Sequence, residues 1–289
     1  MAAAPGYDAD AMVNVREVMI SGIWDPELSV DWVTQKLKNV ALRRIKRDVY
    51  NTEFPSGCYV EPDSANFTLV HVLITGPEGT PYEGGFFYFL VRFPPNYPAQ
   101  PPRVKIMTGN NTVRFNPNLY KDGKVCLSLL GTWDGPSWTP AHCLFTILES
   151  IQGVMNKEPY HNEPDLSIFG TVEGHSERYS DFVSYETLRT AVCGMIEMPH
   201  PNLPASLQSK IKELFMQKFD FYKSKIAEKK HLDKQTMMVD TYGREGETFN
   251  FKRVKKRLLA IHEQISNAST EDTLAASMRK QCCIKGSPA

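Results

Sequence analysis

Apolar residues recur at helical spacing in the segment that begins at Val33. Six of them fall on one face of a helix: Val33, Leu37, Val40, Ala41, Ile45 and Val49. The opposite side carries six basic residues: Lys36, Lys38, Arg43, Arg44, Lys46 and Arg47. The pattern predicts an amphipathic helix with a basic outer face. A charge run of this kind is usually a solvated face, and the alternative is a docking surface for an acidic partner.

Three segments after Gly57 and Pro62 have the composition of β-strands. Residues 67–74, 86–93 and 103–107 are rich in aromatic or β-branched residues and are bounded by glycine and proline. Their close succession along the chain favours an antiparallel meander. The stretch 93–102 contains five prolines, which exclude a helix or a central strand there. Some of its X-Pro bonds are candidates for the cis form.

Regular periodicity is lost between Met107 and Pro140, and a long irregular segment in a compact domain is usually functional. Helical patterns return at 142–155 and 179–195, and two further amphipathic patterns run through 207–226 and 251–265, joined by a loop at 241–246. We therefore divide the chain into four parts. They are a flexible N-terminal segment (1–29), a main domain (30–198), a helical C-terminal extension (199–267) and a polar tail (268–289).

The composition excludes several classes of protein. Lys+Arg and Asp+Glu both number 33, so no net charge attracts the chain to nucleic acid. No apolar run is long enough to cross a bilayer, and the N-terminus lacks the pattern of a secretory signal. The six cysteines form no CxxC pair, which argues against a disulfide framework and a structural zinc site. We expect a monomer of the cytoplasm and nucleus, with no nucleic-acid or membrane partner.

Cys126 differs from the other cysteines in its surroundings. It ends a loop rich in proline, glycine and asparagine, residues 116–126, whereas Cys143 and Cys193 lie within helical apolar patterns. A free cysteine is most often a small buried hydrophobe, and this is our interpretation for Cys58, Cys143 and Cys193. A thiol in a polar, irregular loop can serve as a nucleophile, but these residues alone do not choose a reaction.

The order of short motifs along the chain resembles the ubiquitin-conjugating enzymes over about residues 31–198. The motifs are Gly57-Cys58, Gly76-Pro77, Thr80-Pro-Tyr-Glu-Gly-Gly85, Phe93-Pro-Pro-Asn-Tyr-Pro98, Pro101-Pro102, Asn116-Pro117-Asn118, Asp122-Gly-Lys-Val-Cys126-Leu127 and Trp138-Thr139-Pro140. So many motifs in one order are specific, although none would be alone. The resemblance implies the α+β UBC fold. That fold has an N-terminal helix, a four-stranded antiparallel meander sheet, a long active-site loop and C-terminal helices, here followed by the helical extension.

Other segments resemble the Z-type members of that family. They are the insertion at 131–138, the stretches 108–115 and 159–164, and the helical C-terminal extension. This resemblance implies that the chain takes its modifier from the second, less common ubiquitin-activating enzyme. It also implies that a modifier built from two tandem ubiquitin-like domains is accepted beside ubiquitin.

The resemblance assigns roles to three residues. Cys126 would carry the modifier as a glycyl thioester and pass it to a lysine amine or to a ligase. Asn118 would stabilise the oxyanion of the tetrahedral intermediate, or serve as a structural amide that holds the loop; both alternatives remain. Glu163 would orient the lysine and lower its pKa, the alternative being an exposed loop glutamate. ATP would be consumed upstream by the activating enzyme, so we expect no cofactor and no metal.

Several positions in the loop and at the surface complete this assignment. Asn116, where the family has histidine, Pro117, Ser128, where many members have aspartate, and Asn162 would support the loop. Ala99 stands where several members place an aromatic residue against ligase RING domains, which implies altered RING binding. The implied partners are ubiquitin or a ubiquitin-like modifier, the activating enzyme and ligases. The partner-binding residues would be Arg43, Arg44, Lys46 and Arg47 of the first helix, with Trp138 and Pro140.

Three other functions rank behind this one. A non-catalytic modifier-binding variant of the same fold would lack the cysteine. A cysteine hydrolase needs a base near the thiol, and His142 and His161 lie in no protease signature. A nucleic-acid role for the basic run 251–257 is weakened because its apolar residues fit a helix face. The acyl-carrier prediction expects the Cys126 sulfur to lie open to solvent at the edge of a shallow groove.

Overall fold

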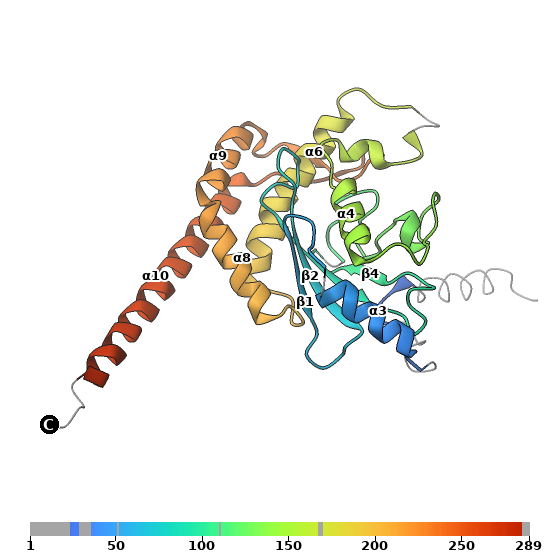
Figure 1. Ribbon diagram of the computed structural model, residues 1–289. Coiled ribbons are helices and arrows are strands. Elements are labelled where there is room, and N and C mark those ends of the chain that lie inside the picture. Colours follow the sequence, from blue (N-terminus) through green and yellow to red (C-terminus); the bar gives the residue numbers. More distant parts are fainter. Residues whose placement is uncertain (1–23, 29–35, 51, 110, 167–169, 285–289) are drawn as a thin grey trace, which may run out of the picture.

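The computed structural model describes residues 24–28, 36–50, 52–109, 111–166 and 170–284, with the backbone alone described beyond residue 268 (Figure 1). Four strands form its main sheet: β1 (Cys58–Pro62), β2 (Leu69–Thr75), β3 (Phe86–Arg92) and β4 (Arg103–Ile106). They pair antiparallel in chain order, β1-β2-β3-β4, so the predicted meander is confirmed. The Tyr97–Pro98 peptide bond in the proline-rich stretch is cis.

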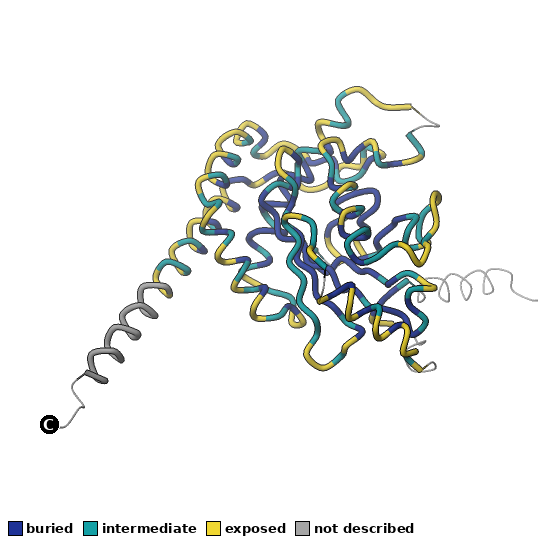
Figure 2. The backbone as a smooth tube through the Cα atoms, viewed as in Figure 1, coloured by how far each residue is buried: buried dark blue, intermediate teal, exposed yellow. Residues whose placement is uncertain are grey.

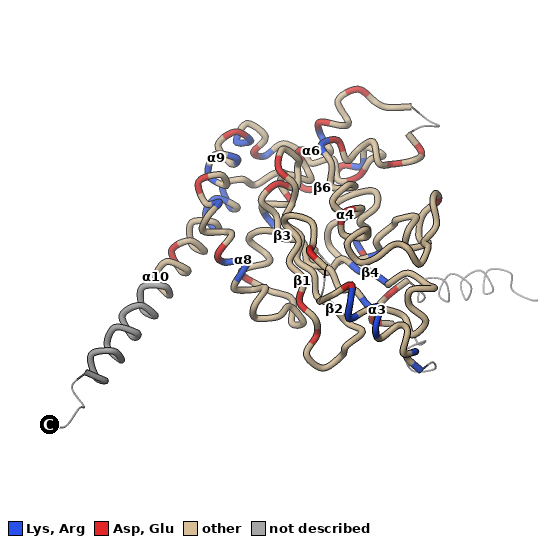
Figure 3. Tube along the Cα trace, viewed as in Figure 1, with Lys and Arg blue, Asp and Glu red and all other residues tan. Residues whose placement is uncertain are grey.

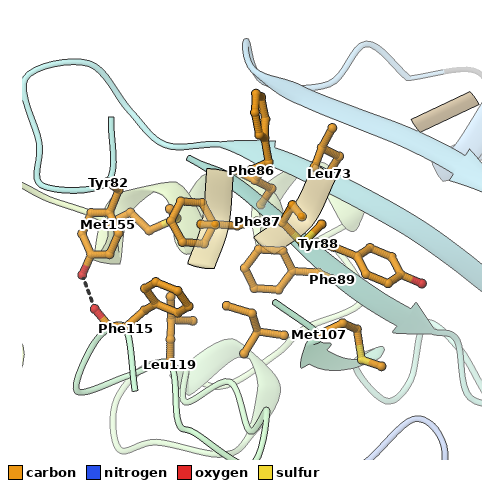
Figure 4. Packing of buried hydrophobic residues seen from close by; sticks show 14 of the residues in the cluster. Leu73, Tyr82, Phe86, Phe87, Tyr88, Phe89, Met107, Phe115, Leu119 and Met155 are labelled. Carbon is orange, nitrogen blue, oxygen red and sulfur yellow. Dashed lines mark hydrogen bonds between the residues drawn. The ribbon is translucent and has the colours of Figure 1, made fainter. Parts of the chain in front are cut away.

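Aromatic side chains fill the space around β2 and β3. Every residue of β3 except Arg92 is buried, because both faces of this central strand are covered. The ring of Phe87 meets that of Phe115 edge to face, with centroids 5.2 Å apart. Figure 4 shows this cluster, with the Tyr82 hydroxyl bonded to the Phe115 carbonyl. The core therefore reaches the start of the loop that contains Cys126.

The first helix described, α3 (Asn39–Tyr50), begins later than the pattern from Val33 predicts. Residues 36–38 are not helical, and 29–35 lie outside the described residues. Val40 is 62% exposed, so its predicted place on the buried face is wrong. The buried face instead includes Asp48, because residues 41, 45, 48 and 49 recur at three- and four-residue spacing on one side of the helix.

Helices flank the sheet on both sides (Figure 1). The predicted helices at 142–155 and 179–195 are confirmed as α4 (Leu144–Val154) and the continuous run α6 (His175–Glu186), η3 (Thr187–Gly194) and α7 (Met195–Glu197). The middle of that run, η3, is π-helical. Among the described residues, none of the helices combines the length and apolar character that a membrane crossing requires.

The C-terminal extension contains more elements than its pattern predicts. The apolar positions of 207–226 belong to two helices, α8 (Ala205–Gln217) and α9 (Phe219–Lys229), followed by η4 (Lys230–Leu232). Residues 236–248 form a small antiparallel hairpin, β5 (Thr236–Met238) and β6 (Glu245–Thr248), so residues 241–244 of the predicted loop lie in its turn and 245–246 belong to β6. The last helix, α10 (Phe251–Ile284), continues past the boundary predicted at 267, into the segment expected to be a polar tail.

The extension packs directly on the turn between β2 and β3. Tyr222 of α9 is fully buried and its hydroxyl donates to the Gly84 carbonyl at 2.8 Å. Gly84 has φ +81°, and a Cβ there would lie 2.8 Å from the Tyr222 ring, so this position requires glycine. Figure 2 shows buried backbone continuing from the sheet into the extension. The extension and the main domain therefore share one core.

Part of the predicted N-terminal tail is held against the sheet. Residues 1–23 lie outside the described residues, but Asp25 is only 3% exposed. Lys105 of β4 donates to Asp25 at 2.7 Å and to Glu27 at 2.9 Å, and Arg92 donates to the Pro26 carbonyl at 3.1 Å. Residues 24–28 are thus docked, contrary to the prediction of mobility, because two carboxylates meet a buried lysine.

Candidate functional site

Cys126 lies at the end of a loop that its own asparagines hold together. The Asn118 side-chain amide donates to the Cys126 carbonyl at 2.8 Å, and the Cys126 N–H donates to the Asn118 carbonyl at 2.8 Å. The Asn118 N–H in turn donates to the Asn116 side-chain oxygen at 2.9 Å. These bonds fix the backbone on either side of the thiol.

Asn116 anchors that loop to the rest of the domain. It is completely buried, and its amide donates to the Tyr82 hydroxyl and to the Val154 carbonyl at the end of α4, both at 2.7 Å. Asn162 reaches the same place, donating to the Asn116 side-chain oxygen at 3.2 Å and to Val154 at 2.8 Å. An asparagine serves at this position because its amide is both donor and acceptor.

The structure covers the Cys126 thiol almost entirely. The residue is 2% exposed, so the expectation of a sulfur open to solvent is wrong. Burial raises the pKa of the thiol and Asp122 raises it further, whereas Lys124, Arg114 and a hydrogen bond with Tyr120 lower it. Among the described residues, Cys126 does not belong to the hydrophobic core cluster. The Tyr120 side chain of the same loop lies close enough to the sulfur to lower the pKa of the thiol.

A hollow lies beside the residues that precede and follow Cys126 in the sequence. Its volume is 410 Å³, and its lining includes Lys124 and Val125 before the cysteine and residues 130–132 after it. Trp24 of the docked N-terminal segment and Pro101 complete part of the wall. Cys126 itself is not among the lining residues, so the sulfur lies next to a groove rather than in it.

Glu163 is engaged by other residues of the chain. It is 5% exposed, so the alternative of an exposed loop glutamate is wrong. One of its oxygens lies 3.5 Å from the Arg114 guanidinium and accepts a hydrogen bond from the Thr241 hydroxyl at 3.0 Å. Asn162 joins the Asn116 network, and the adjacent His161 is exposed. The structure therefore places Asn116, Asn118, Asn162 and Glu163 around one loop.

Comparison with known proteins gives the family of this chain. The model of the family "Ubiquitin-conjugating enzyme" matches residues 44–184. A ubiquitin-conjugating enzyme E2 Z from Xenopus tropicalis is 46% identical over 257 residues, which cover 88% of this chain and 81% of the relative. The E2 Z of Homo sapiens is 43% identical over 274 residues, covering 89% and 77%. The chain belongs to the ubiquitin-conjugating enzyme family.

This ubiquitin-conjugating enzyme is a transferase of the ubiquitination pathway, and its meander sheet and helices form a UBC domain. Membership implies ubiquitin, an activating enzyme and ligases as partners in general. The resemblance seen in the sequence is thereby confirmed at the level of the family.

The basic face of α3 in this ubiquitin-conjugating enzyme divides into two groups. Arg43, Lys46 and Arg47 are exposed, and Figure 3 shows basic residues along α3. Arg44 was predicted on the same outer face, but its side chain is only 13% exposed and binds Asp48 at 2.7 Å. It also donates to the Pro140 carbonyl at 2.7 Å. Arg44 turns inward because Asp48 is buried and needs a counter-charge.

The other predicted surface positions lie near the proline-rich stretch. Trp138 is half-buried, with its ring nitrogen donating to the Pro98 carbonyl at 2.8 Å and its ring centroid 6.0 Å from that of Tyr97. Pro140 is exposed, while its carbonyl is held by Arg44. Ser128 begins the short helix η1 (Ser128–Leu130) and is half-buried. Trp138 thus supports the fold in addition to any contact with a partner.

Sequence analysis missed two groups next to the thiol, Arg114 and Tyr120. The Arg114 guanidinium lies 4.4 Å from the centroid of the Tyr120 ring and donates to the Pro117 carbonyl at 2.7 Å. Both residues belong to the irregular segment that was singled out, but no spacing rule separates them from its other polar residues. Thr241, which meets Glu163 from 78 residues away, gave no local signal at all.

Proposed function

We propose that this chain accepts ubiquitin, and a tandem ubiquitin-like modifier, as a thioester on Cys126. The thiolate attacks the thioester carbonyl on the activating enzyme, the new carbon–sulfur bond forms, and the activating enzyme's thiolate leaves. The observation that supports this best is the pair of bonds between Asn118 and Cys126, which fixes the only cysteine found at the end of the irregular loop. One thioester replaces another, so the step needs no cofactor here, and ATP is used upstream.

The buried thiol must first be uncovered. Tyr120 is the polar side chain in contact with the sulfur, and its own ring is half-exposed. Rotation of this one side chain, without movement of the apolar core, would open a path to solvent. The incoming thioester is already activated, so a thiol with a raised pKa can still exchange.

The second step is attack by a lysine amine on the thioester carbonyl, or by a ligase cysteine. The amine loses a proton, and the Cys126 thiolate leaves as the amide forms. We propose that Asn118 keeps the loop in place for this step, since its amide already donates to the Cys126 carbonyl. Donors placed in advance cost no reorganisation when the oxyanion develops.

The modifier and its delivery follow the similarity to the E2 Z relatives. We propose delivery by the second, less common ubiquitin-activating enzyme through the exposed basic residues Arg43, Lys46 and Arg47. We also propose that the chain is a monomer of the cytoplasm and nucleus that binds no metal, nucleic acid or membrane.

A charging assay tests the proposal. The protein is incubated with ATP, ubiquitin and each of two activating enzymes in parallel, and adducts are resolved with and without reductant. We expect a reductant-sensitive adduct, strongest with one activating enzyme, that becomes a reductant-resistant oxyester in Cys126→Ser. Cys143→Ser, a cysteine in a helical surrounding, serves as the matched control and should charge normally. A reductant-sensitive adduct that persists in Cys126→Ala would place the reactive thiol elsewhere.

A further inference from the structure

The turn between β5 and β6 of the extension reaches the segment that follows η2 (Pro159–Asn162). Thr241 is 4% exposed, and its hydroxyl donates to a Glu163 oxygen at 3.0 Å. The next residue, Tyr242, is 60% exposed, and its hydroxyl donates to Asp165 at 2.8 Å and also bonds Glu163. Two neighbouring hydroxyls of the extension thus meet two carboxylates of the main domain.

Glu163 connects this turn to the thiol through two further side chains. Its carboxylate lies 3.5 Å from Arg114, whose guanidinium donates to the Pro117 carbonyl at 2.7 Å. The same guanidinium lies 4.4 Å from the centroid of the Tyr120 ring, and Tyr120 lowers the pKa of the Cys126 thiol. Pro117 is followed by Asn118, whose amide donates to the Cys126 carbonyl at 2.8 Å. The contacts from the extension to the Cys126 loop are hydrogen bonds, an ion pair and a cation–π contact, and the side chains that make them are buried or half-buried.

We propose that the β5–β6 turn positions the Cys126 loop, with Thr241 acting through Glu163, Arg114 and Tyr120. The inference rests on the proposed function, since Cys126 is the thiol that it positions. Glu163 is a positioning residue in this arrangement, because its carboxylate is already held by Arg114 and the turn. The extension therefore contributes to the reaction without any residue of it touching the reacting atoms.

The physical reason lies in the buried carboxylate. A buried charge is tolerated only when donors surround it, and its position follows theirs. Without the Thr241 hydroxyl, the Glu163 carboxylate is less well fixed, so its ion pair with Arg114 weakens. The cation–π contact between Arg114 and the Tyr120 ring then weakens as well. The Tyr120 side chain then moves away from the sulfur more often, while the Cys126 loop is less often in the geometry needed for transfer. Thiol access and transfer should therefore change in opposite directions.

The test uses the full chain and two hydroxyl variants. Thr241→Val removes the hydroxyl at nearly constant shape, and Thr241→Ser keeps it. For Thr241→Val we expect alkylation of Cys126 by iodoacetamide, followed on its own peptide by mass spectrometry, to be about fivefold faster, and discharge of the charged enzyme to free lysine about fivefold slower. Thr241→Ser should restore both rates towards wild type, which a purely structural loss of packing would not do.

Two controls keep the result decisive. Glu245→Gln on the same hairpin, where the pairing carboxylate is 65% exposed, should leave both rates unchanged. If Thr241→Val fails to fold, Tyr242→Phe, which removes an exposed hydroxyl that also bonds Glu163, should show the same opposed changes. Unchanged alkylation and discharge in a folded Thr241→Val, or a Thr241→Ser that behaves like the valine variant, overturns the inference. Alkylation needs no modifier, so failure of wild-type charging overturns the proposed function separately.

Discussion

At the scale of single residues, the covered thiol of Cys126 sets the chemistry. Burial is the largest cause acting on it and raises its pKa, so the thiolate fraction at neutral pH is lower than for a free cysteine. Below the pKa, alkylation rises about tenfold per pH unit, and an ordinary thiol would level off near pH 8.5. We expect the alkylation rate of Cys126 to continue rising through that pH, measured peptide by peptide. A plateau below pH 8 would contradict the raised pKa.

Asn118 allows a second test at this scale. Asn118→Asp keeps the size of the side chain but places an acceptor against the Cys126 carbonyl, which is itself an acceptor. We expect discharge to lysine to fall by about tenfold, because the loop loses one hydrogen bond and gains a repulsion between two acceptors. The measurement is single-turnover discharge of the charged variant, with Ser128→Ala as a neighbouring loop control. Discharge within about twofold of wild type would remove Asn118 from the mechanism.

The sequence predicted most residues of the loop but not how they are used. Asn116, Asn118 and Asn162 lie together as the family motif implies, because the motif encodes a network of hydrogen bonds. The exposure of Cys126 was predicted wrongly, since a loop rich in glycine and asparagine indicates an open surface, and only the packed structure places Tyr120 against the sulfur. Contacts from distant parts of the chain, such as Thr241 to Glu163, leave no local pattern.

At the scale of elements, the basic residues of α3 have two roles that the sequence pattern did not distinguish: one pairs with a buried carboxylate, and others face solvent. Arg44 neutralises Asp48, which is 2% exposed, whereas Arg43 points to solvent. We expect Arg44→Ala to lower the free energy of unfolding by about 2 kcal/mol, because the buried Asp48 carboxylate then keeps only the Arg47 guanidinium and the Tyr97 hydroxyl as partners. Arg43→Ala should change it by less than about 0.5 kcal/mol, as surface substitutions do. Urea unfolding followed by far-UV circular dichroism measures both.

The same pair of variants tests docking. Under the proposed role of the basic face, Arg43→Ala should slow charging by the activating enzyme, and the slowing should shrink as salt is added, because exposed charges are screened. An equal loss of stability in Arg44→Ala and Arg43→Ala would contradict the different roles assigned to these two arginines. The amphipathic pattern was sufficient to predict the helix, but not its start, because Leu37 keeps the apolar spacing although residues 36–38 are not helical.

At the scale of the whole molecule, segments far apart in the sequence close around one sheet. The extension reaches the β2–β3 turn through Tyr222 and Gly84, and the N-terminal segment reaches β4 through Asp25 and Lys105. Three of the four strands of the main sheet and most helices followed from local sequence patterns, whereas β1 followed only from the family resemblance. These long-range contacts did not, since a single tyrosine or aspartate in a polar stretch carries no periodic signal. The amphipathic helices of the extension indicated that it packs on the main domain, which the structure confirms, but not that it does so through Tyr222 and Gly84.

The N-terminal contact gives a last prediction. Lys105 is the cation that both Asp25 and Glu27 contact, and Trp24 lies 5.9 Å from its ammonium group. Lys105→Met removes that charge but keeps a side chain of similar length on β4. Asp25, 3% exposed, would then be a buried carboxylate without its cation, and releasing residues 24–28 into water costs less than keeping it buried. We therefore expect the segment to detach while the sheet remains folded.

Hydrogen exchange measured by mass spectrometry distinguishes detachment of residues 24–28 from unfolding of the sheet. In Lys105→Met, the peptide that covers residues 24–28 should lose its protection, whereas peptides of β2 and β3 should keep theirs, because local opening leaves the core strands intact. The matched control is Lys124→Met. Lys124 and Trp24 line one hollow, but none of the contacts of the described residues pairs Lys124 with residues 24–28. Retained protection of 24–28 in Lys105→Met would mean that apolar packing of Trp24 and Pro26, rather than the ion pairs, holds this segment against the sheet.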